Sequence, residues 1–322
     1  MISRRHFLIA LGALAPASAF AQPRPVRIGM LGPSPFKVSV YAGGVVRGFA
    51  DLGYREGARA AFDYRSADGR PELYAKQAKE LVESKCDLYV ALGAEPPVRA
   101  LQALRPPAPI LFLAVDYDPL EKGVITDLRR PDRNTTGVYV PQNALVGKRV
   151  EVMREFLPEA KRMLLYADRF SRDQIPAARR AAEQARFELS LVEFDRQPYD
   201  YAAPLAMARK AGVGAFMNLA SPVFARDRQA IAELLTQHKM ASMGSNNVQA
   251  EVGYLVSLGT NTAKIARRVA DTGVRLLKGA KPADIPIEQA DEFELVVNAK
   301  TAKALGLRIP ESIRARTARI VT

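Results

Sequence analysis

The chain contains the segment Asp87-Leu-Tyr-Val-Ala-Leu-Gly-Ala-Glu-Pro96, in which a short apolar run passes through glycine into proline. This pattern predicts a buried strand that leads directly into a helix. The segment Gly214-Ala-Phe-Met-Asn-Leu-Ala-Ser-Pro222 has the same form, and 109–118 resembles 239–247 in a similar way. Members of each pair are about 130 residues apart, the size of an α/β domain. The sequence therefore predicts two similar lobes.

Short β-rich runs alternate with helical patterns through both halves of the chain. The first half has expected strands at 26–31, 60–64, 88–92 and 110–115 and expected helices at 41–52, 72–83 and 97–104. After a new start near Asn134, strands are expected at 162–167, 189–194, 215–219 and 239–243, and helices at 174–185, 201–211 and 224–238. Such alternation is typical of parallel sheets covered by helices on both faces. We therefore assign the chain to the α/β class, with two Rossmann-like lobes.

The region after Asn247 continues neither half in a simple way. It holds a strand-like run at 254–258, an amphipathic helix at 262–277 and a further strand at 293–298. We infer three crossings between the lobes, at about 138–142, 252–258 and 284–290. The first lobe then comprises residues 22–139 and 256–285, and the second comprises 140–255 and 286–322. Because parallel sheets bind ligands beyond the carboxyl ends of their strands, a cleft between the lobes is expected.

Residues 1–21 have the features of a bacterial export signal. Arg4 and Arg5 precede an apolar run, and Ala19-Phe20-Ala21 is a small-residue cleavage pattern. The paired arginines resemble a twin-arginine signal, and the general secretory route also fits. The mature protein is expected to be soluble in the periplasm, with no second segment as apolar as a membrane span. A lipid anchor is not expected, because the sole cysteine, Cys86, lies far from the cleavage point.

The chain carries a formal net charge of +13. Its basic residues are spread over many expected helices, and no nucleic-acid-binding signature groups them. We interpret them as solvated surface and expect a monomer that does not bind nucleic acid. Cys86 precedes an apolar run and is interpreted as a small buried hydrophobe.

Ligand contacts are expected in the loops that follow the strand ends and at the first crossing. The candidates in the first lobe and at the first crossing are Ser34, Phe36, Gly93, Ala94, Glu95, Asp116, Tyr117, Tyr139 and Gln142. Those in the second lobe are Arg169, Phe170, Ser221, Ser245, Asn246 and Asn247. Phe36 would stack on a flat ligand group or stand exposed in a proline-rich turn, and Arg169 would pair with a carboxylate or stay solvated. The Ser221 hydroxyl precedes a helix start that suits an anion.

Several segments resemble a family of bacterial ABC-transporter substrate-binding proteins that includes tryptophan- and tyrosine-binding members. The matching segments are Phe49-Ala-Asp-Leu-Gly-Tyr-Arg-Glu-Gly57, Asn134-Thr-Thr-Gly-Val138, Leu277-Lys-Gly-Ala-Lys-Pro-Ala-Asp-Ile-Pro-Ile-Glu-Gln289 and Phe293-Glu-Leu-Val-Val-Asn298. The resemblance implies a type I periplasmic-binding fold with three interlobe crossings and no catalysis or cofactor. It also implies capture of a small molecule, such as an amino acid or an aromatic or carboxylate compound, and delivery to an ABC permease in the inner membrane.

Two positions depart from the family pattern. Many relatives have Thr or Ser where this chain has Glu95, and a carboxylate there would cap its helix or bind a ligand ammonium. Some amino-acid-binding relatives have an Asp-Asn pair that meets the ligand amine, where this chain has Asn246-Asn247.

Two other functions stay open. A ligand-presenting sensor for a membrane receptor would use the same two lobes. An exported α/β enzyme is a further alternative, but His238 is the only histidine after the export signal and no Ser-His-acid set or metal cluster forms around it. The glycines at 43–48 lack the GxGxxG spacing of a dinucleotide site.

Overall fold

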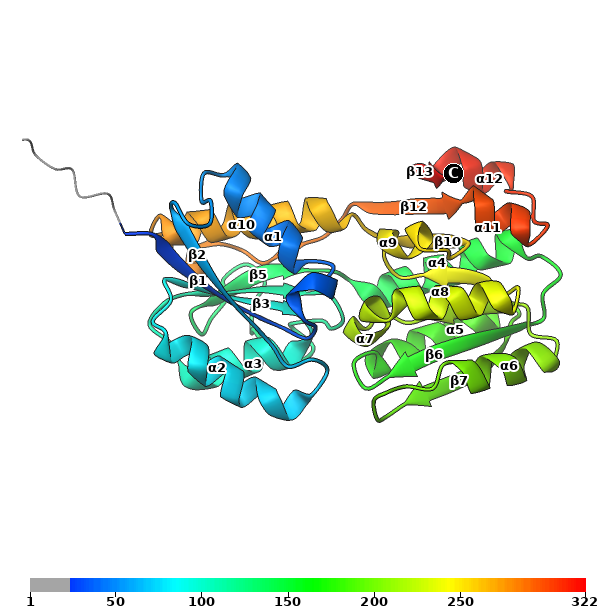
Figure 1. The fold of residues 1–322 in the computed structure, drawn as a ribbon, viewed down its shortest axis with the longest axis horizontal. Coiled ribbons are helices and arrows are strands. Elements are labelled where there is room, and N and C mark those ends of the chain that lie inside the picture. The colour runs from blue at the N-terminus through cyan, green and yellow to red at the C-terminus, as the bar shows by residue number, and fades with distance from the viewer. Residues whose placement is uncertain (1–23) are drawn as a thin grey trace, which may run out of the picture.

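A computed structural model describes residues 24–322, so the expected export signal lies outside the described residues. Two α/β lobes lie side by side along the long axis of the molecule (Figure 1). Each lobe contains one sheet with helices on both faces, which confirms the predicted fold class. No helix within residues 24–322 combines the length and apolarity needed to cross a bilayer.

The first sheet has the strand order β11-β5-β4-β3-β1-β2, and all its pairings are parallel. Its strands are β1 (Val26–Gly32), β2 (Ala60–Ser66), β3 (Leu88–Gly93), β4 (Ile110–Ala114), β5 (Thr135–Tyr139) and β11 (Glu288–Gln289). Helices α1 (Ala42–Asp51) and α10 (Thr262–Leu277) cover one face, and α2 (Tyr74–Glu83) and α3 (Glu95–Leu104) cover the other. The apolar strands β3 and β4 are buried on both faces, as a central parallel strand requires.

The second sheet has the order β13-β12-β10-β9-β8-β6-β7. Its strands are β6 (Arg162–Asp168), β7 (Glu188–Phe194), β8 (Ala215–Asn218), β9 (Ala241–Gly244), β10 (Val256–Thr260), β12 (Phe293–Asn298) and β13 (Arg319–Val321). One face packs against α4 (Gln142–Phe156), α5 (Ile175–Gln184), α11 (Ala299–Ala304) and α12 (Glu311–Arg316). The other packs against α6 (Ala202–Lys210), α7 (Pro222–Arg226) and α8 (Arg228–Gln237). The pairing of β10 with β12 is antiparallel, an exception to the predicted parallel sheet.

Two crossings lie later in the chain than expected. The whole of β10 pairs with β9 and β12, so Val256–Thr260 belongs to the second lobe and not to the first. Likewise β11 pairs with β5, so Glu288–Gln289 stays in the first lobe. An apolar run predicts a strand, but the run does not encode which of two sheets receives it.

The second and third crossings run next to each other. Thr260, the last residue of β10, is paired with Phe293, the first residue of β12. Just beyond this pair, Asn261 Nδ2 donates to Glu294 Oε1 at 2.9 Å. Figure 1 shows β12 leaving the first lobe beside the start of α10. The two connecting segments therefore form one hydrogen-bonded strip.

The glycines at 43–48 serve helix packing. A Cβ atom at Gly44 would lie 2.9 Å from Ala266 Cβ, and one at Gly48 would lie 2.9 Å from Ala270 Cβ. The two glycines thus let α1 approach α10 closely, which explains them without a nucleotide.

Candidate functional site

The loops after the strand ends of the two lobes line a central cavity that opens to solvent. It is lined by seven of the candidates from the sequence: Ser34, Gly93, Asp116, Gln142, Ser221, Ser245 and Asn246. Apolar walls come from residues such as Val38, Val40, Leu92 and Val115 in the first lobe and Ala220 and Pro222 in the second. A cavity with apolar walls and a few polar groups is the usual form of a small-molecule site.

Two further cavities adjoin the central one. The first contains five more candidates: Ala94, Glu95, Tyr117, Arg169 and Phe170. The second is lined by Tyr117, Gln142 and Gln174, among others. Asp116 lines all three cavities, so this residue lies where they meet.

Asp116 lies two residues beyond the end of β4, and the residue is only 5 % exposed. Among residues 24–322, no side-chain or backbone donor and no cation pairs with this carboxylate. Burial raises the pKa of Asp116 to about 8, and the negative charge of Asp168 adds to the rise. The first lobe thus presents an acidic group without a protein partner to the cavity.

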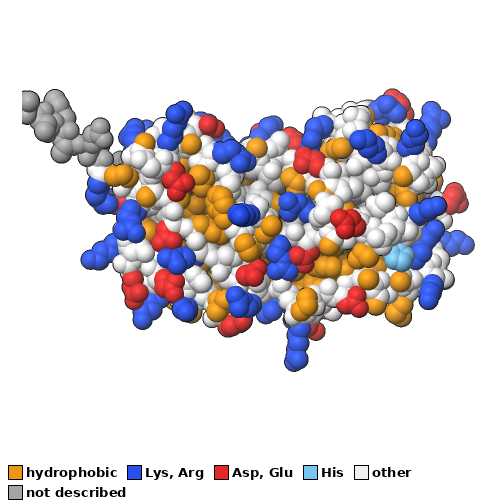
Figure 2. Space-filling model, in the orientation of Figure 1, with side chains coloured by type: hydrophobic (Ala, Val, Ile, Leu, Met, Phe, Trp, Pro, Cys, Tyr) orange, Lys and Arg blue, Asp and Glu red, His pale blue; other side chains and the backbone are white. Residues whose placement is uncertain are grey.

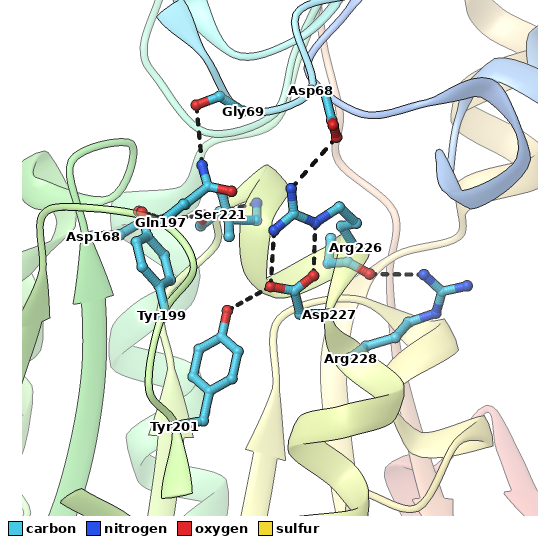
Figure 3. Close-up of polar contacts among 12 residues, drawn as sticks. Asp68, Gly69, Asp168, Gln197, Tyr199, Tyr201, Ser221, Arg226, Asp227 and Arg228 are labelled. Atoms are coloured by element: carbon cyan, nitrogen blue, oxygen red, sulfur yellow. Dashed lines mark hydrogen bonds and ion pairs between the residues drawn. The ribbon is translucent and has the colours of Figure 1, made fainter. Parts of the chain in front are cut away.

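Asp168, at the end of β6 in the second lobe, has many partners. It accepts hydrogen bonds from Ser221 Oγ at 2.5 Å and Tyr199 Oη at 3.4 Å, two residues that Figure 3 shows beside it. It also accepts from Ser171 Oγ and from the Phe170 amide, both at 3.0 Å. Burial raises the pKa of Asp168, while these hydrogen bonds oppose the rise. Because the Ser221 hydroxyl donates to Asp168 and also accepts from the Val223 amide, it is held as a fixed part of the second lobe.

Arg149 on α4 is fully buried and links the start of α4 to β10 and to the loop after β9. Its Nε atom donates to the Leu258 carbonyl oxygen of β10 at 2.8 Å, and its Nη2 atom donates to Gln142 Oε1 and to the Ser245 carbonyl oxygen, both at 2.9 Å. Its Nη1 atom has no acceptor among the described residues. Burial lowers the pKa of Arg149 to about 9. The guanidinium therefore fixes two cavity-lining residues, Gln142 and Ser245.

A buried polar network holds the loop that contains Ser245 and Asn246. The backbone amides of both residues donate to Gln249 Oε1, at 2.6 and 3.3 Å. Gln249 Nε2 donates to Asn218 Oδ1 at 3.1 Å, and Tyr254 Oη donates to the same oxygen at 3.0 Å. The loop is thus held in position by the buried side chains of Gln249, Asn218 and Tyr254, none of which lines the central cavity.

Three polar contacts, here called the interlobe contacts, join the lobes across the cleft. Arg226 Nη1 lies 3.6 Å from Asp68 Oδ1, and Gln197 Nε2 donates to the Gly69 carbonyl oxygen at 3.0 Å (Figure 3). The third contact is Lys122 Nζ to Asp173 Oδ2 at 2.7 Å. Asp227 orients Arg226 through two hydrogen bonds, at 2.6 and 3.0 Å. These contacts hold the lobes in a closed arrangement.

Three candidates lie outside these cavities. Phe36 is 42 % exposed, and its ring packs edge-on against Tyr64 at 5.3 Å. Tyr139 is buried, and its Oη atom donates to Gln289 Oε1 at 2.7 Å within the first lobe. Asn247 is buried at the start of α9 (Asn247–Glu251). In the adjoining cavity, Glu95 is paired with Arg99 at 2.9 Å, one helical turn away.

Sequence reasoning did not identify Tyr41, Arg149 or Arg226 as parts of the site. Tyr41 and Arg226 line the central cavity, and Arg149 lies behind it. Arg226 lies only four residues after Ser221-Pro222, so the predicted helix start was a usable signal for it. Nothing local distinguishes Arg149 from the other basic residues of the chain.

Basic and acidic side chains are interspersed over both lobes on the face shown in Figure 2. Lys and Arg form no continuous stripe there, in agreement with a solvated charged surface on that face. Cys86 is buried, and burial raises the pKa of its thiol to about 11, as a structural cysteine requires.

Comparison with known proteins agrees with this architecture. Residues 37–321 match the family model described as ABC transporter substrate binding protein. A tyrosine-binding protein of Clostridioides difficile (strain R20291) is 23 % identical over 271 residues, which cover 82 % of this chain and 76 % of that protein.

Two solved structures share the fold over their whole length. A conserved domain protein of Vibrio cholerae is 24 % identical and has a TM-score of 0.79, covering 92 % of this chain and 100 % of that one. An ABC domain in complex with L-Trp from Streptococcus pneumonia is 23 % identical and has a TM-score of 0.78, covering 91 % and 100 %. Since the family model matches most of the chain, the protein belongs to the family of ABC transporter substrate-binding proteins.

Proposed function

We propose that the protein is an exported, periplasmic solute-binding protein that captures a small molecule between its lobes and delivers it to an ABC importer. The observation that carries this proposal is the central cavity, which is lined from both lobes at the carboxyl ends of their strands. The relatives named for binding tyrosine and L-Trp support an amino acid, or a related aromatic or carboxylate compound, as the ligand. No chemical step is required of the site.

The proposed mechanism is closure of the lobes on the ligand. A ligand that touches both walls of the cavity binds the closed arrangement more tightly than the open one, and only this difference in affinity shifts the population. The interlobe contacts lie around the cavity and form only when the lobes meet. The permease would then recognise the surface of the closed protein.

We assign direct ligand contact to the seven candidates that line the central cavity. The candidates in the adjoining cavity, Ala94, Glu95, Tyr117, Arg169 and Phe170, would contact a ligand that extends beyond it. Phe36, Tyr139 and Asn247 would act by supporting neighbouring loops, because the structure places them outside these cavities.

The test combines ligand identification with a measurement of closure. Native mass spectrometry of the freshly purified protein is expected to reveal a co-purified small molecule. That compound should raise the melting temperature by mass action and reduce the radius of gyration in small-angle scattering. A ligand that binds tightly without compaction would rule out closure as the mechanism. Fractionation of cells that produce the full chain should place the mature protein in the periplasm.

A further inference from the structure

The carboxyl group of Asp116 is the one ionisable group in the lining of the central cavity that has no ion-pair or hydrogen-bond partner within residues 24–322. The other charged residue in its lining is Arg226, which is bound to Asp227 and lies near Asp68. Arg149 uses its donors on Gln142 and two carbonyl oxygens. Arg149 Nη1 has no acceptor among the described residues, and Arg169 lines the adjoining cavity together with Asp116. Neither guanidinium, nor any other cation of residues 24–322, forms an ion pair with Asp116.

The ionisable groups around Asp116 cannot neutralise it. Asp168 carries the same sign of charge and interacts unfavourably with it. Three tyrosines lie close to Asp116: Tyr41, Tyr74 and Tyr117. Burial is the main cause of their raised pKa values, and the charge of Asp116 adds to the rise. A phenol carries no positive charge, so none of them can neutralise the carboxylate. A buried carboxylate without a partner costs several kcal/mol. Such an unsatisfied group calls for an explanation, and a partner on a bound molecule is one.

On the opposite wall of the cavity, the second-lobe residues that correspond in position to Asp116 are uncharged. β4 and β9 occupy corresponding positions in the two sheets, so Asp116 after β4 corresponds to Ser245 and Asn246 after β9. Both of these side chains line the same cavity as Asp116 and carry no charge. A cationic group on the ligand would therefore find its charge partner in the first lobe and additional hydrogen-bond partners in the second.

We propose that Asp116 is the residue that selects the ligand, by pairing with a cationic nitrogen such as a primary ammonium group. This inference rests on the proposed function and names the chemistry of one end of its ligand. A metal ion is a poorer occupant, since residues 24–322 contain no group of three His, Cys, Asp or Glu side chains that could hold one. A neutral ligand that accepts a hydrogen bond from protonated Asp116 is the competing outcome of the test.

The experiment uses pairs of probes that differ only in the ammonium group. The pairs are L-tyrosine with 3-(4-hydroxyphenyl)propionate, L-tryptophan with indole-3-propionate, and L-leucine with 4-methylpentanoate. Calorimetric titrations are made with the mature wild type, with Asp116→Asn and with Asp51→Asn, an exposed carboxylate at the end of α1 that serves as control. Melting temperature and circular dichroism verify that each variant is folded.

The wild type and Asp51→Asn are expected to bind only ammonium-bearing probes. Asp116→Asn should lose about 10- to 100-fold in affinity for them, the usual range for a charge-assisted hydrogen bond. The wild type at pH 7 should also release about one proton per ligand, seen by comparing buffers of different ionisation enthalpy, and Asp116→Asn should release none.

The outcomes separate the two proposals. If the wild type binds the ammonium-free acids as tightly as the amino acids, or if Asp116→Asn keeps full affinity, the role of Asp116 is disproved while solute binding stands. If no probe of either kind binds, both the amino-acid form of the proposed function and this inference fail.

Discussion

The Nη1 atom of Arg226 lies 3.6 Å from the Oδ1 atom of Asp68, and the two residues belong to different lobes. Arg226 is held in place by Asp227, which also accepts a hydrogen bond from Tyr201 Oη at 2.8 Å. The second lobe therefore presents a pre-oriented guanidinium to an acidic loop of the first. Together with Gln197–Gly69 and Lys122–Asp173, this contact contributes to the closed arrangement, to which a ligand would add its own contacts.

Arg226→Gln is expected to weaken ligand binding by about 2- to 5-fold, because a partly exposed ion pair contributes at most about 1 kcal/mol. The free protein should also become more extended in small-angle scattering. The control is Arg267→Gln, which removes an exposed ion pair with Asp271 on α10, away from the cleft. Equal effects of both substitutions would contradict a role of Arg226 in closure.

Gly69→Ala is expected to weaken closure, because the amide end of the Gln197 side chain must move away from the new Cβ atom and loses its hydrogen bond to the Gly69 carbonyl oxygen. A Cβ atom at Gly69 would lie 2.8 Å from Gln197 Oε1, and the residue has φ +72°. The matched control is Gly57→Ala, which has φ +75° but meets nothing within 4 Å, so it carries the same backbone strain without the clash between lobes. Affinity should fall for Gly69→Ala alone, and Gln197→Ala should restore part of it. A loss of affinity in Gly57→Ala of the same size would attribute the effect to backbone strain.

Arg149→Met is expected to lower the free energy of unfolding by about 3 kcal/mol, because three buried acceptors lose their donor. Arg149→Lys should also destabilise the protein, since one ammonium group cannot reproduce the forked geometry of a guanidinium. Urea denaturation measures both effects. The neighbouring exposed Lys148 provides the control, and Lys148→Met should change stability by no more than about 0.5 kcal/mol.

The ligand-free protein is expected to lose stability as the pH rises from about 4 to about 8, because of Asp116. Its folded-state pKa of about 8 lies above the unfolded value of about 3.9, so the folded state binds the proton more tightly. The penalty for the buried charge therefore grows over this interval by about 1.4 kcal/mol per pH unit and is constant above it. The stability of Asp116→Asn minus that of the wild type, measured by urea denaturation across this pH range, isolates the effect from Asp168. A difference that does not change with pH would show that Asp116 titrates normally.

Much of the fold was predictable because buried parallel strands are short apolar runs bounded by turn residues. The structure confirms the predicted strands near Val26, Leu88 and Ile110, with small shifts at their ends. Helix α4 was not predicted, because the polar Gln142 and Arg149 lie among its buried residues and weaken its apolar pattern. The predicted helix at 224–238 is divided into α7 and α8 at Asp227. The assignment of β10 to the wrong lobe reflects tertiary pairing that no local pattern encodes.

The site was predictable to the extent that it follows strand ends. Asp116, Ser221 and Asn246 were found in this way, because the carboxyl ends of parallel strands meet at one edge. Tyr41 precedes α1, and its orientation depends on packing for which the sequence has no direct signal. Arg226 ends α7, so only the predicted helix start at Ser221-Pro222 pointed to it. The unpaired state of Asp116 is a property of its surroundings and is visible only in three dimensions.

The paired connectors that include Thr260, Asn261, Phe293 and Glu294 restrict how the molecule can move. Two independent connecting segments would allow one lobe to twist or slide relative to the other. Because these two connecting segments are hydrogen-bonded to each other, we expect the lobes to rotate about a single hinge axis close to them. The remaining connecting segment would bend during this rotation. A small rotation at this hydrogen-bonded strip would then produce a large change in the separation of Asp68 and Arg226, which lie far from the hinge axis.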